Sequence, residues 1–448
     1  MHVTEIEWRK PFDAFAPLAG EAHAHLLHGG DLSAGAEWSI ITAFPATVIE
    51  ANAESGNPFH ALDSILQERR IHREPENFRF PFMSGVLGVV GYEAARHVEP
   101  KHRLPTSPYA FPDVSFGVYD ASALFSRLEK RAYIAGRDKA ACSRLERALG
   151  TQREMRTEHP FLFHSVNSNF SPSRYEAAVS EVIESILDGD YYQANISHRI
   201  TAVSSETLDA FDIFRRLAAR SDAFFGALLQ LSGVAVISNS PERFFRISPA
   251  AGERRRIVAE PIKGTRRRGG TPEQDKLLAQ ELLLDRKDRA ENIMIADLLR
   301  NDLSRVCMDG TIREESICDL MSLANVHHLV SRISGELYSG AGIGDVFAAL
   351  FPCGSVTGAP KVEAMKSIAR IEKTGRGPYC GAIGYIDDSG AADFAVAIRT
   401  LIAENEKLVI PVGGGVTLRS DPAGEYEETI VKAAGAFNVL GLSPDDLS

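Results

Sequence analysis

Cysteine is scarce in this chain: its 448 residues include five cysteines, with no CxxC pair and no Cys/His metal spacing. Such a scattered set argues against a disulfide framework and favours a reducing compartment. The sequence has no run of 18 uncharged apolar residues, and its N-terminus, "MHVTEIEWRKPFDAF", lacks an apolar signal region. We therefore expect no membrane span and no signal peptide, and a cytoplasmic protein.

Several signatures of common function classes are also missing. The net charge of -11 and pI near 5.7 argue against a nucleic-acid surface, and the Arg triplets at 254–256 and 266–268 are interpreted as solvated loop charge. There is no G-x-S-x-G elbow and no H-E-x-x-H helix, so hydrolase chemistry has no support. "FPCGSVTGAPK" fails the phosphate-loop pattern, and "VGGGV" and "CGAIGY" lack dinucleotide-fold spacing. Nucleotide binding is therefore disfavoured.

The chain divides at a polar, aperiodic stretch, residues 150–173, which is the best candidate for a boundary or crossover. Strand-like runs dominate the region before it, residues 1–150. In the region after it, residues 173–442, strand patterns and helical patterns mix without a regular βαβ rhythm, starting with the helical pattern "SPSRYEAAVSEVIESILDGD". This organisation predicts an α+β fold with mixed or antiparallel sheets, and not a doubly wound sheet.

Two predicted helices each carry a pair of acids three residues apart. Asp288 and Glu291 share an edge of "DRKDRAENIMIADLLRND", and Glu425 and Glu428 share an edge of "GEYEETIVKAAGAFNVL" with Lys432 on the same stripe. Four carboxylates from two helices would suit Mg²⁺, which prefers oxygen ligands. The alternative is two solvated acidic faces.

Single polar residues in apolar surroundings offer further candidates. Glu242, in "NSPERFF", is either a general acid whose pKa is raised by desolvation or an ion-pair partner of Arg243. His327 and His328 lie in an apolar run and are either buried structural histidines or site residues. Arg399, in "FAVAIRTL", is either a carboxylate-binding fork or a surface arginine at a strand end.

Lys263 raises the sharpest question, because it stands in "AEPIKGTRRRGG", where the chain is expected to turn after an apolar run. Taken alone, a lysine in a turn is a solvated residue. The glycine-containing loops would let backbone N–H groups approach a small anion, since glycine has no Cβ to block that approach.

In order, the motifs SPERF, PIKGT, DRAEN-x-M-x-x-D-L-x-RND, HHLVS, G-S-x-T-G-AP-K, CG-x-IGY, IRT, GGG and Y-x-ET-x-x-K resemble those of the chorismate-utilising enzymes. That family includes component I of anthranilate synthase and of aminodeoxychorismate synthase, and the isochorismate and salicylate synthases. The resemblance runs from about Ser173 to Leu440, and "FPFMSGVLGVVGYEAAR" is similar to the companion N-terminal region of the first two. It implies an anthranilate synthase component I-like sandwich of antiparallel sheets with helices on the outside.

The resemblance also implies roles for the candidate residues. Glu291 and Glu428 would ligate Mg²⁺, with Asp288 and Glu425 acting through water, and Glu242 would protonate the departing C4 hydroxyl of chorismate. The substrate carboxylates and ring would contact a larger set: Gly264, Thr265, His328, Tyr385, Arg399, Gly413, Gly414, Gly415 and Lys432.

Lys263 separates the members of the family. PIKGT resembles the aminodeoxychorismate-forming type, which serves para-aminobenzoate and folate biosynthesis, whereas the anthranilate-forming type, the main alternative, carries alanine at that lysine. The water-activating lysine of isochorismate and salicylate synthases corresponds to Gln193 here. Lys263 is therefore expected to attack C2 of chorismate as a neutral amine, giving an adduct that ammonia resolves at C4.

The resemblance implies partners as well. No glutaminase or lyase domain is recognisable, so ammonia is expected from NH₄⁺ or from a separate glutamine amidotransferase subunit. A tryptophan-binding L-L-E-S stretch is replaced by "HLLHGGDL", so tryptophan inhibition is not expected, and a structural amino-acid site stays an alternative. "RRRGG" is expected to form a mobile lip over the cleft, and a degenerate paralogue without turnover would have lost a catalytic residue.

Overall fold

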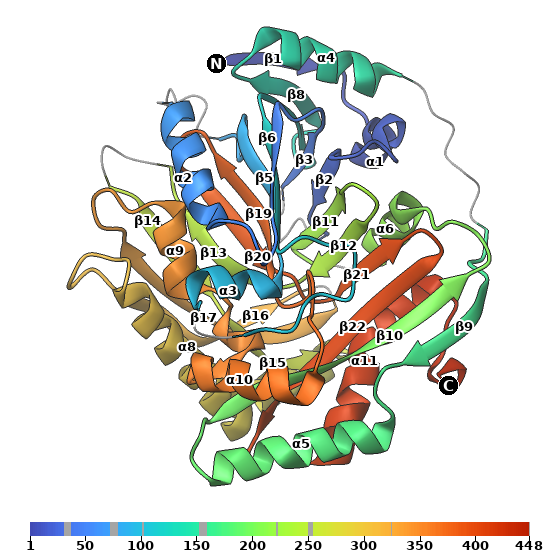
Figure 1. The fold of residues 1–448 in the computed structure, drawn as a ribbon, viewed down its shortest axis with the longest axis vertical. Helices are drawn as coiled ribbons and strands as arrows, with labels where there is room; N and C mark the ends of the chain where they lie inside the picture. The colour runs from blue at the N-terminus through green and yellow to red at the C-terminus, as the bar shows by residue number, and fades with distance from the viewer. Residues whose placement is uncertain are drawn as a thin grey trace.

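The computed structural model describes residues 1–30, 37–71, 79–100, 103–151, 159–220, 223–249, 254–323 and 325–447. Within these ranges, two large antiparallel sheets form a sandwich with helices on the outside (Figure 1). The α+β class expected from the sequence is confirmed.

The larger sheet has 12 strands in the described part of the chain. In order across the sheet they are β1 (His2–Ile6), β8 (Arg131–Gly136), β7 (Ala121–Ser126), β3 (Trp38–Thr42), β2 (His25–His28), β11 (Phe225–Gln230), β12 (Ala235–Ser240), β21 (Thr400–Glu404), β22 (Lys407–Thr417), β10 (Gln193–Ser204) and β18 (Gly358–Ala359), with β9 (Phe163–Ser168) also paired to β10. The long β10–β22 pair therefore lies near one edge.

The second sheet has 10 strands in the same ranges. Their order is β15 (Ile262–Arg267), β17 (Val326–Glu336), β14 (Arg256–Glu260), β13 (Arg243–Ile247), β20 (Ala392–Val396), β19 (Ala382–Asp387), β5 (Gly85–Val90), β6 (Val114–Tyr119) and β4 (Thr47–Ala51), with β16 (Arg313–Ser322) also paired to β17. Strands from both ends of the sequence thus enter both sheets, and regions 1–150 and 173–442 are interleaved through shared strand pairs.

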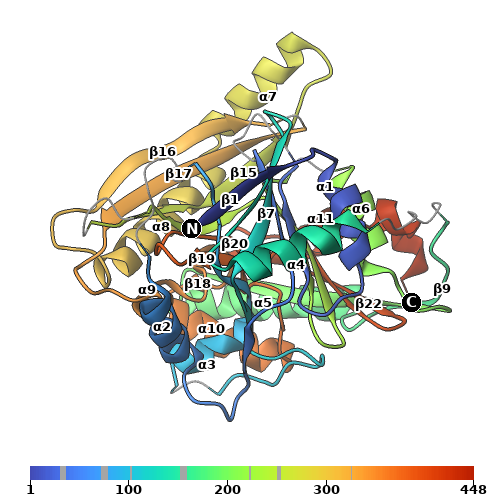
Figure 2. The same ribbon diagram turned by 90° about the horizontal axis from the view of Figure 1, so that it is seen from above.

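Several helices begin where the sequence has a capping side chain. They are α1 (Pro11–Phe15), α2 (Pro58–Arg69), α3 (Ala95–Val98), α4 (Lys139–Gly150), α5 (Pro172–Leu187), α6 (Ala210–Ala218), α7 (Pro272–Leu284), α8 (Arg286–Ser304), α9 (Ile343–Leu350), α10 (Lys361–Glu372) and α11 (Pro422–Leu440). The Asp285 side chain accepts the first free N–H groups of α8, and Asp421 caps α11 in the same way. Figure 2 shows α7 projecting beyond β15 and β17.

The core between the sheets is built from alternating strand residues that point inward. Leu87 and Ile383 of one sheet pack in a single buried cluster with Ile40, Leu229 and Val409 of the other. Burying an aliphatic side chain of this kind stabilises the fold by roughly 1.5–3 kcal/mol. No helix in the described ranges is long and apolar enough to cross a bilayer.

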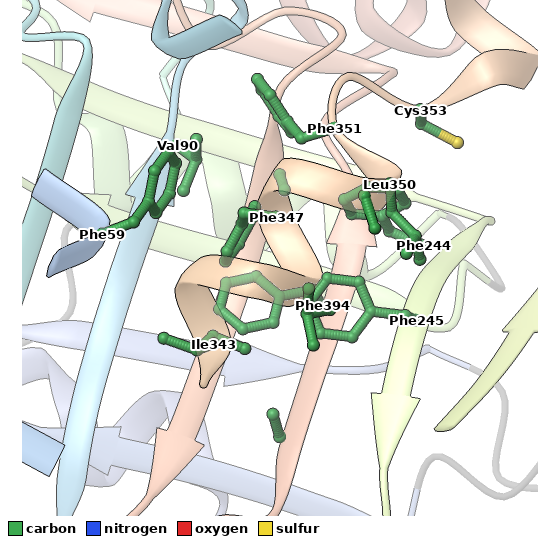
Figure 3. Packing of buried hydrophobic residues seen from close by; sticks show 14 of the residues in the cluster. Phe59, Val90, Phe244, Phe245, Ile343, Phe347, Leu350, Phe351, Cys353 and Phe394 are labelled. Atoms are coloured by element: carbon green, nitrogen blue, oxygen red, sulfur yellow. The ribbon is translucent and has the colours of Figure 1, made fainter. Parts of the chain in front are cut away.

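A second apolar cluster supports the region where the candidate residues gather. Figure 3 shows Phe244, Phe245, Phe347 and Phe394 packed together, with Cys353 at the edge of the group. The rings of Phe245 and Phe394 lie 5.1 Å apart, and those of Phe347 and Phe394 lie 5.3 Å apart. This packing holds β13 against α9 and β20.

The stretch at residues 150–173, the candidate boundary or crossover, joins α4 to α5 and contains strand β9, which pairs with β10; residues 152–158 lie outside the described ranges. The expectation that the arginines of "RRRGG" lie in a loop was wrong. The "RRRGG" lip is not a loop at its start, because β15 runs to Arg267. Arg266 is ion-paired to Asp285 and Asp288, and Arg268 is ion-paired to Asp275. The positive charges of these two arginines are therefore neutralised by neighbouring carboxylates.

Candidate active site

Lys263 lies where the two sheets approach each other. It belongs to β15 of one sheet, yet its Nζ is 3.3 Å from the place where a Cβ on Gly415 of β22 would lie. Helices α8 and α11 carry the acid pairs beside these strands, and α8 packs on β15 while α11 packs on β22 (Figure 1). The candidate site therefore draws on two segments, residues 262–304 and 407–440, that are far apart in the sequence.

The chain does not turn at Lys263, as the sequence suggested, but continues through a bulge. The register between β15 and β17 shifts between Lys263 and Thr265, and Gly264 has a φ of +80°. A Cβ on Gly264 would lie 2.9 Å from the Cβ of Asp288. Glycine is therefore required there both for the backbone conformation and for the close approach of α8.

Glu242 lies in the connection between β12 and β13, with 4% of its surface exposed. Its Oε1 accepts a hydrogen bond of 2.7 Å from the Ser355 hydroxyl. Burial raises the pKa of Glu242 to about 7, although that hydrogen bond, the charge of Lys263 and the Ile262 N–H oppose the rise. The carboxyl group is thus partly protonated near neutral pH, as a general acid requires.

The alternative interpretation of Glu242, an ion pair with Arg243, is wrong. Arg243 forms ion pairs with Asp393, at 2.9 Å, and with Glu260. The Arg243 guanidinium is therefore already paired with two other carboxylates. Ser355, the hydrogen-bond donor to Glu242, was missed because it lies 113 residues away in the sequence and no local pattern marks it.

The acids of α8 differ in their surroundings. Glu291 Oε1 is buried and has no hydrogen-bond partner among the described residues. Burial raises the pKa of Glu291, and the charges of Lys263 and Lys287 only partly offset this effect. Asp288, by contrast, accepts a 3.0 Å hydrogen bond from Arg266. Glu291 is therefore the acid of this pair that is available to a ligand.

The acids of α11 form a second contrasting pair. Glu425 is buried and accepts a 2.5 Å hydrogen bond from the Ser420 hydroxyl, and burial raises its pKa. Glu428 is half exposed and lies 2.8 Å from the Nζ of Lys432. Partial burial would raise the pKa of Glu428, but Lys432 and the other nearby ammonium groups outweigh it and lower the pKa.

The chemistry of these acids fits a hard cation. All four donor groups are carboxylates, and the buried Oε1 of Glu291 has no hydrogen-bond partner among the described residues. In the described part of the chain, however, no three His, Cys, Asp or Glu side chains converge closely enough to form a metal cluster. Mg²⁺ often binds through one or two carboxylates plus water and substrate, so the residues fit a site completed by a ligand.

His328 and His327, adjacent in β17, have different roles in the fold. His328 is 3% exposed, and its Nδ1 lies 2.9 Å from the Thr265 hydroxyl. Burial, and secondarily Arg399, lowers the pKa of His328 to about 4, so its ring is neutral. His327 bonds Asp275 and Ser322 at 3.0 and 2.7 Å, which fits the structural interpretation.

Arg399 begins the approach to β21 with a φ of +49°. Arg399 is exposed to solvent, and partial desolvation by the neighbouring protein lowers the pKa of its guanidinium. It forms no ion pair within the described ranges, whereas Arg243, Arg266 and Arg268 all do. An exposed cation without a carboxylate partner is accessible to an anionic ligand.

The expected glycine loop is part of a strand, because Gly413–Gly415 lie inside β22. A Cβ on Gly414 would come within 2.9 Å of Glu425 Oε2, and one on Gly415 within 2.9 Å of Gln193 Nε2. Lys432 donates a 2.9 Å hydrogen bond to the Gly413 carbonyl. The glycines therefore admit polar side chains from both faces of β22.

Tyr385 is the one candidate that the structure places elsewhere. Its ring lies 5.3 Å from that of Phe82 in a separate cavity of about 670 Å³, which Arg243, His28 and Gly29 also line. This cavity includes part of the "HLLHGGDL" stretch, of which Asp31 and Leu32 lie outside the described residues. The lining of this cavity includes Tyr385 but neither Lys263 nor Glu242.

Comparison with known proteins places this geometry in a family. A family model described as chorismate binding enzyme matches residues 26–438. Aminodeoxychorismate synthase component 1 of Salmonella typhimurium is 34% identical over 449 residues, 96% of each chain. Anthranilate synthase component 1 of Methanothermobacter thermautotrophicus is 31% identical over 459 residues, 98% of this chain and 94% of its own. The chain therefore belongs to the chorismate binding enzyme family.

Solved structures share this fold. The crystal structure of anthranilate synthase component I from Streptococcus pneumoniae TIGR4 matches with a TM-score of 0.78 and 26% identity, over 89% of this chain and 92% of that one. MenF, the menaquinone-specific isochorismate synthase of Escherichia coli, matches with a TM-score of 0.75 and 15% identity, over 98% and 94%. Enzymes named for different products thus share the fold, and the particular reaction depends on the site residues.

Proposed function

We propose that this protein is an aminodeoxychorismate synthase component I, which converts chorismate and ammonia to 4-amino-4-deoxychorismate and water. The observation that carries the proposal is Lys263, a lysine close enough to the buried acid Glu242 for its charge to act on the pKa of that acid. Together they supply a nucleophile and a proton for the leaving hydroxyl. The relatives from Salmonella typhimurium and Escherichia coli that bear this name are 34% and 32% identical to the chain, which supports the proposal.

Chorismate carries two carboxylates, and the cleft offers cations and backbone donors for both. We propose that Arg399 and Lys432 bind these anions, together with the backbone of Gly264, Thr265 and Gly413–Gly415. The neutral ring of His328 would lie beside the substrate ring. Tyr385 is left out of this set because it lines the other cavity.

In the first step, Lys263 Nζ forms a bond to C2 as a neutral amine. The ring double bond shifts, and the C4 hydroxyl leaves as water with the proton of Glu242. In the second step, ammonia forms a bond to C4, the double bond shifts back, and Lys263 leaves C2 as a free amine. The new C4 ammonium group then returns one proton to Glu242. Covalent catalysis thus divides one displacement into two.

We further propose that Glu291 and Glu428 are Mg²⁺ ligands and that Asp288 and Glu425 act through water. When bound, the ion supplies positive charge opposite the ring carboxylate of the substrate. The ion pair between Asp288 and Arg266 is compatible with an indirect role for Asp288. The unpaired, buried Oε1 of Glu291 supports direct coordination of the ion by this residue.

Glu291→Gln is expected to raise the Mg²⁺ concentration for half-maximal binding at least about tenfold, because a neutral amide replaces a carboxylate ligand. Calorimetric titration of the protein with MgCl₂, with and without chorismate, measures this directly. Asp297→Asn, an exposed acid on the same helix, serves as the control and should bind as wild type does. Equal affinity for wild type and Glu291→Gln would exclude Glu291 as a ligand.

Ammonia is proposed to come from a separate glutamine amidotransferase subunit. The curated relatives carry the designation component 1, which supports a second component for this protein. Free ammonium salt at high concentration would then replace the partner in solution, so the reaction can be tested with this chain alone.

Anthranilate synthase component I is the second candidate. Relatives with that name are 30–33% identical to this chain, close to the values for the first candidate. Both activities use chorismate and ammonia, so sequence identity does not separate them. The lysine at position 263 favours the first, because a covalent adduct at C2 blocks direct attack of ammonia on that carbon.

Product identification decides between the two candidates. Purified protein with chorismate, MgCl₂ and ammonium chloride is expected to form 4-amino-4-deoxychorismate, which mass spectrometry distinguishes from chorismate by the replacement of a hydroxyl with an amine. A reaction without ammonium is the control and should form no aminated product. Anthranilate together with pyruvate would contradict the proposal, and no consumption of chorismate would favour a paralogue without turnover.

A further inference from the structure

Asn292, the residue after Glu291 on α8, is fully buried and has no role in the chemistry described so far. Asparagine is a poor helix former, and a buried amide without hydrogen-bond partners destabilises a fold. Asn292 is also the first buried residue of α8, because residues 286–291 are all at least partly exposed. A buried amide at this position therefore needs specific partners.

Both ends of the Asn292 amide are hydrogen-bonded to β17. Nδ2 donates a 3.0 Å hydrogen bond to the Leu329 carbonyl, and Oδ1 accepts a hydrogen bond from the Ser331 hydroxyl. The Ser331 oxygen in turn accepts a 3.0 Å hydrogen bond from the N–H of Cys318 in β16. A carbonyl offers no hydrogen, so the amide nitrogen has to face Leu329 and the amide oxygen Ser331.

The network lies where the pairing of β16 with β17 is interrupted. The register shifts between Ser316 and Asp319, and Cys318 between them has a φ of +56°. In a regular ladder the N–H of Cys318 would bond a backbone carbonyl, whereas here the side chain of Ser331 accepts it. The bulge therefore depends on the same hydroxyl that orients Asn292.

Leu329 connects Asn292 to the candidate site. Leu329 is the cross-strand partner of Lys263 in β15 and the neighbour of His328 in β17. On the helix side, Asn292 directly follows Glu291, and α8 packs on both β15 and β17 (Figure 1). One amide thus joins the backbone of the proposed metal ligand to the strands that carry the proposed nucleophile and the neutral histidine.

Other contacts hold this end of α8 less firmly. The buried apolar side chains of the helix all lie after Asn292: Ile295, Ala296, Leu299 and Leu303. Before it, Arg266 pairs with Asp285 and Asp288, but these side chains are 20–31% exposed, and a partly exposed ion pair contributes little to stability. The amide is therefore the first buried contact next to Glu291.

We propose that Asn292 is a positioning residue that sets the place of Glu291 relative to Lys263 and His328 through the Leu329 carbonyl. The proposal rests on the proposed function in one respect, namely that Glu291 binds Mg²⁺ while Lys263 reacts with the same substrate. It applies equally to either of the two candidate reactions, since both use chorismate.

The test is Asn292→Leu, which keeps the approximate side-chain volume and removes both hydrogen bonds. The dissociation constant for Mg²⁺, measured by calorimetric titration without chorismate, is expected to rise about tenfold. The value of kcat at saturating MgCl₂ should fall at least about tenfold, because a misplaced ligand and nucleophile no longer meet one substrate. KM for chorismate should stay near wild type, because Arg399 and Lys432 lie on other elements.

Gln230→Met is the matched control for replacing a buried amide that holds backbone carbonyls. Gln230 is 8% exposed in β11, and its Nε2 donates hydrogen bonds of 3.1 Å to the carbonyls of Leu18, Glu21 and Ala24. This variant should lose thermal stability and keep the wild-type Mg²⁺ affinity and kcat. The comparison separates positioning from a general loss of stability.

Ser331→Ala is a milder second variant, because it removes the hydroxyl that orients the amide and keeps the bond from Nδ2 to Leu329. It is expected to raise the dissociation constant for Mg²⁺ about threefold. Thermal unfolding shows whether each variant folds. If Asn292→Leu does not, Ser331→Ala carries the test, and an unchanged Mg²⁺ affinity in this variant would overturn the proposal.

Wild-type Mg²⁺ affinity and kcat in folded Asn292→Leu would also overturn it, as would equal losses in Gln230→Met. Anthranilate as the wild-type product, with the same changes in Asn292→Leu, would refute the proposed function and leave the positioning role standing. A wild-type protein that binds no Mg²⁺ would refute the metal assignment. A fall in kcat at unchanged KM in Asn292→Leu would then still support positioning of Lys263.

Discussion

Glu242→Gln is expected to lower kcat for chorismate consumption by about 10²–10⁴-fold, because the amide cannot donate the proton that the C4 hydroxyl needs to leave as water. The wild-type rate should fall as pH rises through about 7, the pKa to which burial raises Glu242, since the acid form is lost there. Steady-state rates between pH 5.5 and 9 measure both effects.

Glu242→Gln is expected to lower activity without lowering the stability of the folded protein above neutral pH. The folded-state pKa of Glu242 lies above the unfolded value of 4.5, so its contribution to stability is fully present below 4.5 and is lost as pH rises through about 7. Glutamine does not ionise, so Glu242→Gln avoids the destabilisation that a buried carboxylate causes above pH 7. The melting temperature of this variant at pH 8 should equal or exceed that of wild type. A slow variant that is stably folded thus isolates the chemical role.

Glu93→Gln is the matched control, because Glu93 is equally buried and burial raises its pKa to about 7 as well. Glu93 accepts hydrogen bonds from the backbone N–H groups of Arg376 and Gly377, outside the cleft. Its amide variant should keep kcat near wild type. Equal loss of activity in both variants, or a wild-type rate for Glu242→Gln, would refute the general-acid assignment.

Lys263→Ala is expected to abolish the covalent substrate adduct and to lower kcat at least about 10²-fold, because alanine has no amine to form the bond to C2. Denaturing the protein during turnover and weighing it by mass spectrometry detects the adduct as chorismate minus water. Wild type should show this mass when ammonium is withheld.

Lys263→Arg separates the covalent role from the electrostatic one. Arginine keeps the positive charge near Glu242 and Glu291, but its guanidinium does not provide a neutral amine at accessible pH. It should therefore be as inactive as the alanine variant and form no adduct. A wild-type rate for either variant, without an added nucleophile, would show that Lys263 is not the nucleophile.

Much of the site could be predicted from the sequence where local chemistry decided the structure. The acid pairs of α8 and α11 follow from helical spacing, and Asp285 and Asp421 mark the starts of these helices. The ordered motifs also predicted the family, which the comparisons confirmed. Spacing of three residues on a helix is a local property and needs no knowledge of the fold.

Predictions failed where the outcome depended on the neighbouring strand. The turn at Lys263 is a bulge, and the glycine loop at Gly413–Gly415 is strand, because pairing with β17 and β10 determines both conformations. Tyr385 points into another cavity, since the position of a strand residue depends on which face its sheet buries. None of these partners is nearby in the sequence.

The sequence by itself determined which residue types are available: a lysine, a glutamate after a strand, two acid pairs, an arginine and a series of glycines. Only the tertiary structure decided which of them meet. It buried Glu242 beside Ser355, removed Arg243 from it, and joined Asn292 of α8 to the carbonyl of Leu329, the cross-strand partner of Lys263. The physical reason is that burial and strand pairing are long-range properties, and they determine the pKa values and unpaired groups from which the chemistry follows.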